Sequence, residues 1–117
     1  KIFGNDYSTK DGTCIRDYIH VIDLADAHMK ALDFLENREN LFVNLSTGCG
    51  SSVLEVVNET EKIIGHKINY SLTSRREGDP AILVADPKRA NEKLTWEANT
   101  SSLQNIISSM WKHYKNK

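Results

Sequence analysis

Apolar residues recur at helical spacing in three segments of the chain. The first runs from Leu24 to Leu35, the second from Val53 to Ile64, and the third from Leu103 to Tyr114. Most residues at positions i, i+3, i+4 and i+7 are apolar in each segment, as on one face of an amphipathic helix. We expect the first and third stripes, which contain Ala27 and Met110, to form buried core.

Signals for helix ends accompany these segments. Asp23 is the expected N-cap of the first helix. Ser52-Val53-Leu54-Glu55 is a capping box at the start of the second, and Gly65 is its expected stop. Asp86-Pro87 predicts the start of a short further helix through Leu94, and Ser101-x-x-Gln104 predicts the start of the last helix.

Four segments rich in β-prone residues lie before and between these helices. They are Ile2–Asp6 (a short strand with a turn), Cys14–Val21, Leu41–Leu45 and Ile68–Leu72. Strands and helices therefore alternate along the chain. That order predicts an α/β fold.

Composition narrows the class of protein. With 117 residues, 39% of them hydrophobic, the chain has the length of one modest domain. A formal net charge of −1 argues against a nucleic-acid-binding role, and no apolar run is long enough to predict a membrane span. Cys14 and Cys49 stand apart, without histidines at ligand spacing, so we expect free thiols, no metal site and a cytoplasmic location.

The segment from Ser74 to Pro80 carries the strongest candidate chemistry. It places Arg75 and Arg76 directly before a Gly78-Asp79 turn in a chain that is otherwise nearly charge-balanced. Guanidinium groups match phosphate oxygens two at a time, and an aspartate accepts hydrogen bonds from vicinal hydroxyls such as those of ribose. The segment therefore fits half of a nucleotide site, although an exposed charged turn would have the same composition.

Two other segments have a functional and a structural interpretation. In Arg16-Asp17-Tyr18, the arginine could bind a second phosphate with the tyrosine hydroxyl beside it, or Arg16 and Asp17 could be surface charges and Tyr18 a core residue. The glycine-containing segment from Ser46 to Ser52 could cradle phosphate, but it has no complete GxGxxG and no P-loop lysine. A plain turn into the following helix explains it better.

Taken in order, these segments resemble the C-terminal part of UDP-glucose 4-epimerases, a group of extended short-chain dehydrogenase/reductases. The resemblance covers nearly the whole chain. The segments that carry it are Ile2-Phe3-Gly4-Asn5-Asp6-Tyr7, Asp11-Gly12-Thr13, Arg16-Asp17-Tyr18-Ile19-His20-Val21, Asp23-Leu24-Ala25-Asp26-Ala27-His28, Asn44-Leu45-Ser46-Thr47-Gly48, Ser52-Val53-Leu54-Glu55-Val56, Arg75-Arg76-Glu77-Gly78-Asp79 and Leu94-Thr95-Trp96.

The resemblance implies a role for individual residues. Arg16 and Arg76 would hold the diphosphate of a UDP-sugar, and Asp79 would bind the ribose hydroxyls. The other implied contacts are Val53, Ile2 and Phe3 at the uracil, Tyr18 near the diphosphate and Leu83 at the hexose, with Lys1, Arg75, Glu77 and Gly78 as neighbours of the site.

The resemblance also implies a reaction and an assembly. In these enzymes, NAD on an N-terminal Rossmann domain takes a hydride from C4 of the hexose and returns it to the other face of a 4-keto intermediate. Neither the glycine fingerprint for NAD nor the catalytic Tyr-x-x-x-Lys is present in this chain. Residues 1–117 would thus be the C-terminal UDP-sugar-binding region without the Rossmann domain, inactive alone and without a catalytic residue of its own.

Further expectations concern the longer enzyme. Residues of about 20–47 would pack on the nucleotide domain, and the complete enzyme would be a homodimer in galactose metabolism. The chain alone would expose apolar surface and self-associate. Two alternatives stay open: a free-standing nonenzymatic module that binds a partner protein, and a part of another nucleotide-sugar epimerase or dehydratase.

Overall fold

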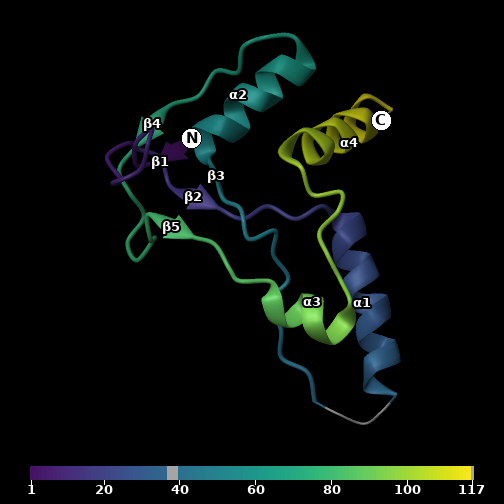
Figure 1. Ribbon diagram of the computed structural model, residues 1–117. Coiled ribbons are helices and arrows are strands. Elements are labelled where there is room, and N and C mark those ends of the chain that lie inside the picture. The colour runs from purple at the N-terminus through teal and green to yellow at the C-terminus, as the bar shows by residue number, and fades with distance from the viewer. Residues whose placement is uncertain (37–39, 117) are drawn as a thin grey trace.

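The computed structural model describes residues 1–36 and 40–116, which form an α/β arrangement of short strands and longer helices (Figure 1). This confirms the predicted fold class. In chain order the elements are β1 (Ile2–Phe3), β2 (Ile15–Arg16), α1 (Val21–Leu35), β3 (Ser51–Ser52), α2 (Val53–Ile64), β4 (Leu72–Thr73), β5 (Ile82–Leu83), α3 (Lys88–Leu94) and α4 (Leu103–Lys115).

The strands form two small sheets. β1 pairs in parallel with β4, and Phe3 lies opposite Thr73. β2 is the central strand of the other sheet, antiparallel to β3 and parallel to β5, so that Arg16 lies opposite both Ser51 and Leu83. Residues from distant parts of the chain therefore converge on Arg16.

The predicted limits of α2 are confirmed. The Ser52 hydroxyl accepts from the Glu55 amide, the Glu55 carboxylate accepts from the Ser52 amide, and Gly65 ends the helix with a left-handed φ of +81°. The short helix α3 is present, but its N-cap is Pro87 and not Asp86 as predicted; the Asp86 carboxylate accepts from the Lys88 amide at 2.9 Å.

The predicted N-caps of α1 and α4 are each wrong. His20, not Asp23, caps α1, since its Nδ1 accepts from the Ile22 amide. Ser102, not Ser101, caps α4. The reason is a long-range contact: the Ser101 hydroxyl donates to the buried Asp23 carboxylate at 2.5 Å, so neither side chain is available to its own helix end.

The predicted strands are mostly wrong in extent. Only Ile15–Arg16 of the segment 14–21 is a strand, and the strand expected at 68–72 is displaced to Leu72–Thr73. The segment 41–45 is not a strand. None of its residues pairs with another strand among the described residues; instead, Leu41, Val43 and Leu45 pack on a hydrophobic cluster, which explains their alternating apolar pattern.

That cluster lies between α1 and α3 and consists of Ala27, Ala90, Leu94 and Trp96. Trp96 is completely buried, and its indole Nε1 donates to the Asp23 carbonyl at 2.9 Å. The Ala27 stripe is thus core at its centre only, because Leu24, Leu32 and Leu35 of the same helix are exposed.

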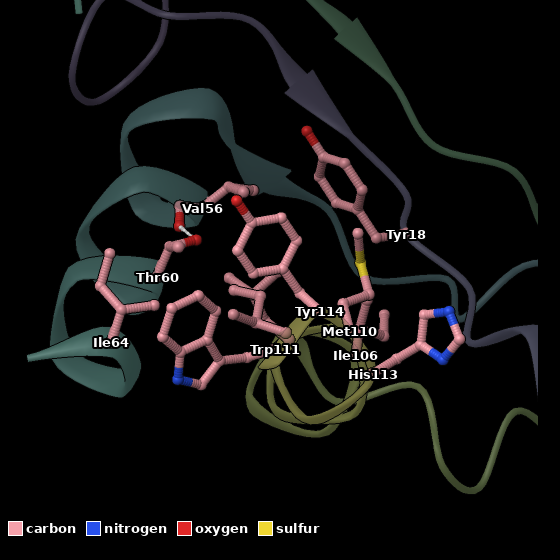
Figure 2. Close-up of a pocket in the computed structure, with 11 residues that line it drawn as sticks. Tyr18, Val56, Thr60, Ile64, Ile106, Met110, Trp111, His113 and Tyr114 are labelled. Carbon is pink, nitrogen blue, oxygen red and sulfur yellow. Dashed lines mark hydrogen bonds between the residues drawn. The ribbon is translucent and has the colours of Figure 1, made fainter. Parts of the chain in front are cut away.

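The other predicted core stripe is buried only in part, because Leu103, Ile106 and Trp111 are half-buried. α4 lies beside α2, and Figure 2 shows Met110, Trp111 and Tyr114 around an open apolar groove between the two helices. Met110 and Tyr114 are 66% and 71% exposed, whereas Ile107 is buried. Within the described residues, no segment covers the side of the groove on which Met110 and Tyr114 are exposed.

The whole arrangement is open in shape. The radius of gyration is 16.7 Å, whereas a compact domain of 117 residues would have about 13 Å. Among residues 1–36 and 40–116, no helix combines the length and the apolar character needed to cross a membrane.

Candidate functional site

The structure brings three of the predicted site residues into direct contact. Asp79 Oδ1 accepts from Arg16 Nη2 at 2.5 Å, and Asp79 Oδ2 accepts from Arg76 Nη2 at 3.1 Å. Arg16 belongs to β2, whereas Arg76 and Asp79 belong to the turn between β4 and β5. One carboxylate therefore joins two arginines that lie 60 positions apart, and we call these three residues the Asp79 cluster.

The turn has the backbone conformation that its sequence predicts. The Asp79 amide donates to the Arg76 carbonyl at 3.3 Å, which closes the turn. Gly78 has φ of +76°, a left-handed conformation that disfavours residues with a Cβ. A Cβ built there would meet no atom within 4 Å, so the requirement for glycine is conformational and not steric.

Burial and charge differ within the Asp79 cluster. The hydrogen bond from Arg16 is the main cause that lowers the pKa of Asp79, so its carboxylate is ionised at neutral pH. The side chains of Asp79 and Arg16 are 16% and 19% exposed, whereas that of Arg76 is 63% exposed. The cluster thus has a formal charge of +1, and its outer arginine is open to an anionic ligand.

The two adjacent arginines have different surroundings. Arg76 stacks its guanidinium 4.9 Å from the ring centroid of Phe3. Arg75 turns the other way, 4.2 Å from the Tyr7 ring, and its Nε donates to the Asp6 carboxylate at 2.7 Å. Arg75 is thereby tied to the N-terminal loop, and Arg76 is the arginine that faces the Asp79 cluster.

Other predicted site residues lie in the two sheets or directly follow a strand. Leu83 is opposite Arg16 in the sheet and is exposed, and Val53 opens α2 with its amide bonded to the Cys14 carbonyl. Phe3 is partly exposed beneath Arg76. Ile2 is 3% exposed, so its side chain is part of the packing between β1 and β4.

Tyr18 lies at the apolar groove, beside Met110 in Figure 2. Burial raises the pKa of its hydroxyl, although the nearby charge of Arg16 lowers it in part. Among the described residues, no hydrogen bond joins Tyr18 to Arg76 or Asp79. Lys1 and Glu77 are exposed and have no ion pair in the described part of the chain.

Asp17 has a structural role that the sequence analysis missed. Its Oδ1 accepts from the Thr47 amide at 3.0 Å and the Thr47 hydroxyl at 2.6 Å, and its Oδ2 accepts from the Gly48 amide at 3.1 Å. These amides are the ones that a phosphate cradle would need. The carboxylate already occupies them, which favours the interpretation of residues 46–52 as a plain turn.

Asp11 also links distant segments. It accepts from the Thr13 amide and hydroxyl, and its other oxygen accepts from the Ser52 hydroxyl at the start of α2. Burial by itself would raise the pKa of Asp11, but these hydrogen bonds outweigh it and lower the pKa. The sequence Asp11-Gly12-Thr13 is typical of a turn in which the aspartate side chain accepts from the backbone, and it could have indicated the structural role of Asp11.

The described residues contain no group of three or more histidine, cysteine, aspartate or glutamate side chains that could hold a metal ion. Cys14 is buried and Cys49 exposed, and both are free.

Comparison with known proteins identifies the class. The model of the GDP-mannose 4,6 dehydratase family matches residues 1–110, and the chain belongs to this family. Its curated relatives include the UDP-glucose 4-epimerase of Rhizobium meliloti, 47% identical over 95% of this chain and 34% of the relative, and that of Bacillus subtilis, 47% identical over 95% and 33%.

A solved structure agrees with these relatives. The UDP-glucose 4-epimerase of Bifidobacterium longum, in complex with NAD+ and UDP, superposes with a TM-score of 0.91 and 41% identity over 99% of this chain and 34% of the other. These matches confirm the resemblance to UDP-glucose 4-epimerases and the expected partial α/β fold. The chain spans about one third of the length of the proteins that it matches.

Proposed function

We propose that this chain is the UDP-hexose-binding part of a UDP-glucose 4-epimerase, which interconverts UDP-glucose and UDP-galactose through an NAD-dependent 4-keto intermediate. The observation that carries the proposal is the Asp79 cluster. It supplies two guanidinium groups for a diphosphate and one ionised carboxylate for ribose hydroxyls at a single place. Similarity to an epimerase solved with UDP supports the choice of nucleotide.

Each residue then has a defined task. Arg76, the exposed arginine, takes the diphosphate first, and Arg16 holds it from the inner side. Phe3 and Val53 pack on the uracil, Leu83 borders the hexose, and Tyr18 lies at the rim near Arg16. Lys1, Arg75, Glu77 and Gly78 are neighbours of the site, and we assign none of them a contact with the ligand.

In the described part of the chain, the glycine-containing turn does not fit the diphosphate of NAD. The glycine-containing turn at 46–52 is the best candidate cradle, and Asp17 already occupies its Thr47 and Gly48 amides. We therefore propose that the hydride and proton transfers depend on residues outside this chain. The complete enzyme would be a cytoplasmic homodimer, with residues of about 20–47 against its nucleotide domain; of that range, 37–39 lie outside the described residues.

Two assays test this proposal. The protein expressed from its complete gene should convert UDP-galactose to UDP-glucose when NAD is bound. The isolated 117-residue chain should show no turnover, even with NAD added. Measurable epimerisation by the pure chain would contradict our assignment of the chemistry to other residues.

A second candidate is another nucleotide-sugar enzyme, because the matching family model is that of GDP-mannose 4,6 dehydratase. The same complete protein should be offered GDP-mannose and UDP-glucuronic acid. Turnover of one of these in preference to UDP-galactose would favour this candidate over the epimerase.

A further inference from the structure

We propose that Asp79 is also an anion selector, whose carboxylate lowers the affinity of the site for phosphate compounds that carry no ribose. This inference rests on the proposed function, because it assigns a specificity to the same site. In the Asp79 cluster, the Asp79 carboxylate and an incoming phosphate compound compete for the same arginines.

The competition is for the two arginines. Each oxygen of Asp79 pairs with a different guanidinium, through Arg16 Nη2 and Arg76 Nη2. Arg16 also donates Nη1 to the Ile15 carbonyl at 2.6 Å, so each of its two terminal nitrogens already makes one hydrogen bond. An incoming phosphate compound competes with Asp79 for the same two guanidinium groups, and it meets a cluster of charge +1 and not +2.

A ligand that contains ribose can supply new hydrogen-bond donors to Asp79 when its arginines bind the phosphates. An ionised carboxylate only accepts hydrogen bonds, so Asp79 must find new donors when its arginines turn to the ligand. The vicinal hydroxyls of a ribose are such donors, whereas inorganic pyrophosphate is itself an anion and has no vicinal hydroxyls to offer. With pyrophosphate bound, the largely buried Asp79 carboxylate would lack hydrogen-bond partners. It would also lie close to the negative charge of the ligand, and both effects reduce the binding free energy.

The test compares binding of UDP and of inorganic pyrophosphate by isothermal titration calorimetry, on the protein expressed from its complete gene. Asp79→Asn keeps the shape of the side chain and removes its charge. We expect the pyrophosphate Kd to fall by about fivefold or more, the scale of one close charge near a protein surface. The selectivity for UDP over pyrophosphate should fall with it.

Glu77→Gln is the matched control. It removes one negative charge from the same turn, but the Glu77 side chain has no ion pair among the described residues. If net charge alone governed binding, the two variants would behave alike; we expect a much smaller change for Glu77→Gln. Asp79→Ser, a second variant that also removes the carboxylate, should tighten pyrophosphate binding in the same direction.

The outcomes separate this inference from the proposed function. If the wild-type protein binds UDP but neither Asp79 variant binds pyrophosphate more tightly, Asp79 is not a selector and the UDP site stands. An equal gain in Glu77→Gln would also overturn the inference. Failure of the wild-type protein to bind UDP would instead contradict the proposed function. Circular dichroism of each variant confirms folding.

Discussion

Arg75 and Arg76 are adjacent in sequence but form different contacts. The first is bound to Asp6 and Tyr7, and the second to Asp79 and Phe3. Only the second lies where a ligand of the Asp79 cluster would bind. The pair therefore offers a direct comparison of a site arginine with a structural one.

We expect Arg76→Ala to weaken UDP binding by about 1.5–3 kcal/mol, the cost of losing a charge-assisted contact. Arg75→Ala should change it by less than about 1 kcal/mol, because Arg75 forms an exposed ion pair with Asp6 and no contact with the Asp79 cluster. Titration of UDP into both variants of the complete protein measures this. Equal losses in the two variants would show that Arg76 contributes no more to UDP binding than Arg75 does.

The residue types of this site were predictable, but their pairing was not. Arginine beside a Gly-Asp turn indicated phosphate chemistry from the sequence alone. Spacing gave no reason to join Arg16 to Asp79, since 63 positions separate them; their common site was inferred from the resemblance to epimerases. The role of Asp17 was missed because its partners, Thr47 and Gly48, are 30 residues or more away.

At the scale of elements, local signals predicted helix ends well only where the capping residues had no distant partner. Ser52, Glu55 and Gly65 act within their own helix as expected. Asp23 and Ser101 bind each other across 78 positions, so they do not cap the helices that follow them. The strands are two residues long, and such lengths depend on which neighbour a segment meets and not on its own composition.

The cap of α2 should contribute more to stability than the cap of α4. Ser52 both completes a capping box and donates to Asp11, whereas Ser102 provides a simple cap through the Asn105 amide. We expect Ser52→Ala to lower the free energy of unfolding by about 1–2 kcal/mol and Ser102→Ala by about 0.5–1 kcal/mol. Urea unfolding of both variants checks the order, and a larger loss for Ser102→Ala would contradict it.

The link between α1 and the start of α4 should depend on pH. Burial alone would raise the pKa of Asp23, but hydrogen bonds from Ser101 and Thr100 outweigh it and lower the pKa below its usual 3.8. A lowered folded-state pKa adds stability that is present above the unfolded pKa and is lost as pH falls through the folded value.

Asp23→Asn tests this link. The melting temperature of the wild-type protein should fall between about pH 5 and about pH 2, and that of the variant should fall less over the same range. Other carboxylates titrate there too, including Asp11, so the difference between the two curves is the informative quantity. Parallel curves would show that the ionisation of Asp23 does not stabilise the fold.

At the scale of the whole molecule, the described part of the chain leaves apolar surface uncovered. A radius of gyration of 16.7 Å indicates an open arrangement, with one cluster between α1 and α3 and an open groove between α2 and α4. Exposed side chains of α1 and α4 include Leu32, Met110 and Tyr114. Contiguous apolar surface of this kind favours association in water.

We therefore expect the isolated 117-residue chain to self-associate, in part through the groove between α2 and α4. Met110→Lys should weaken that association, because a contact at this groove would bury the lysine charge, which is costly. The monomer should tolerate the change, because the Met110 side chain is 66% exposed there. Lys112→Met, a reciprocal change on the same helix, is the control, since Lys112 is exposed and does not line the groove. Sedimentation over a range of concentrations gives the monomer fraction of each variant. A monomeric wild-type chain at all concentrations would contradict the expectation, and an unchanged association in Met110→Lys would place the contact on another surface, such as the exposed face of α1.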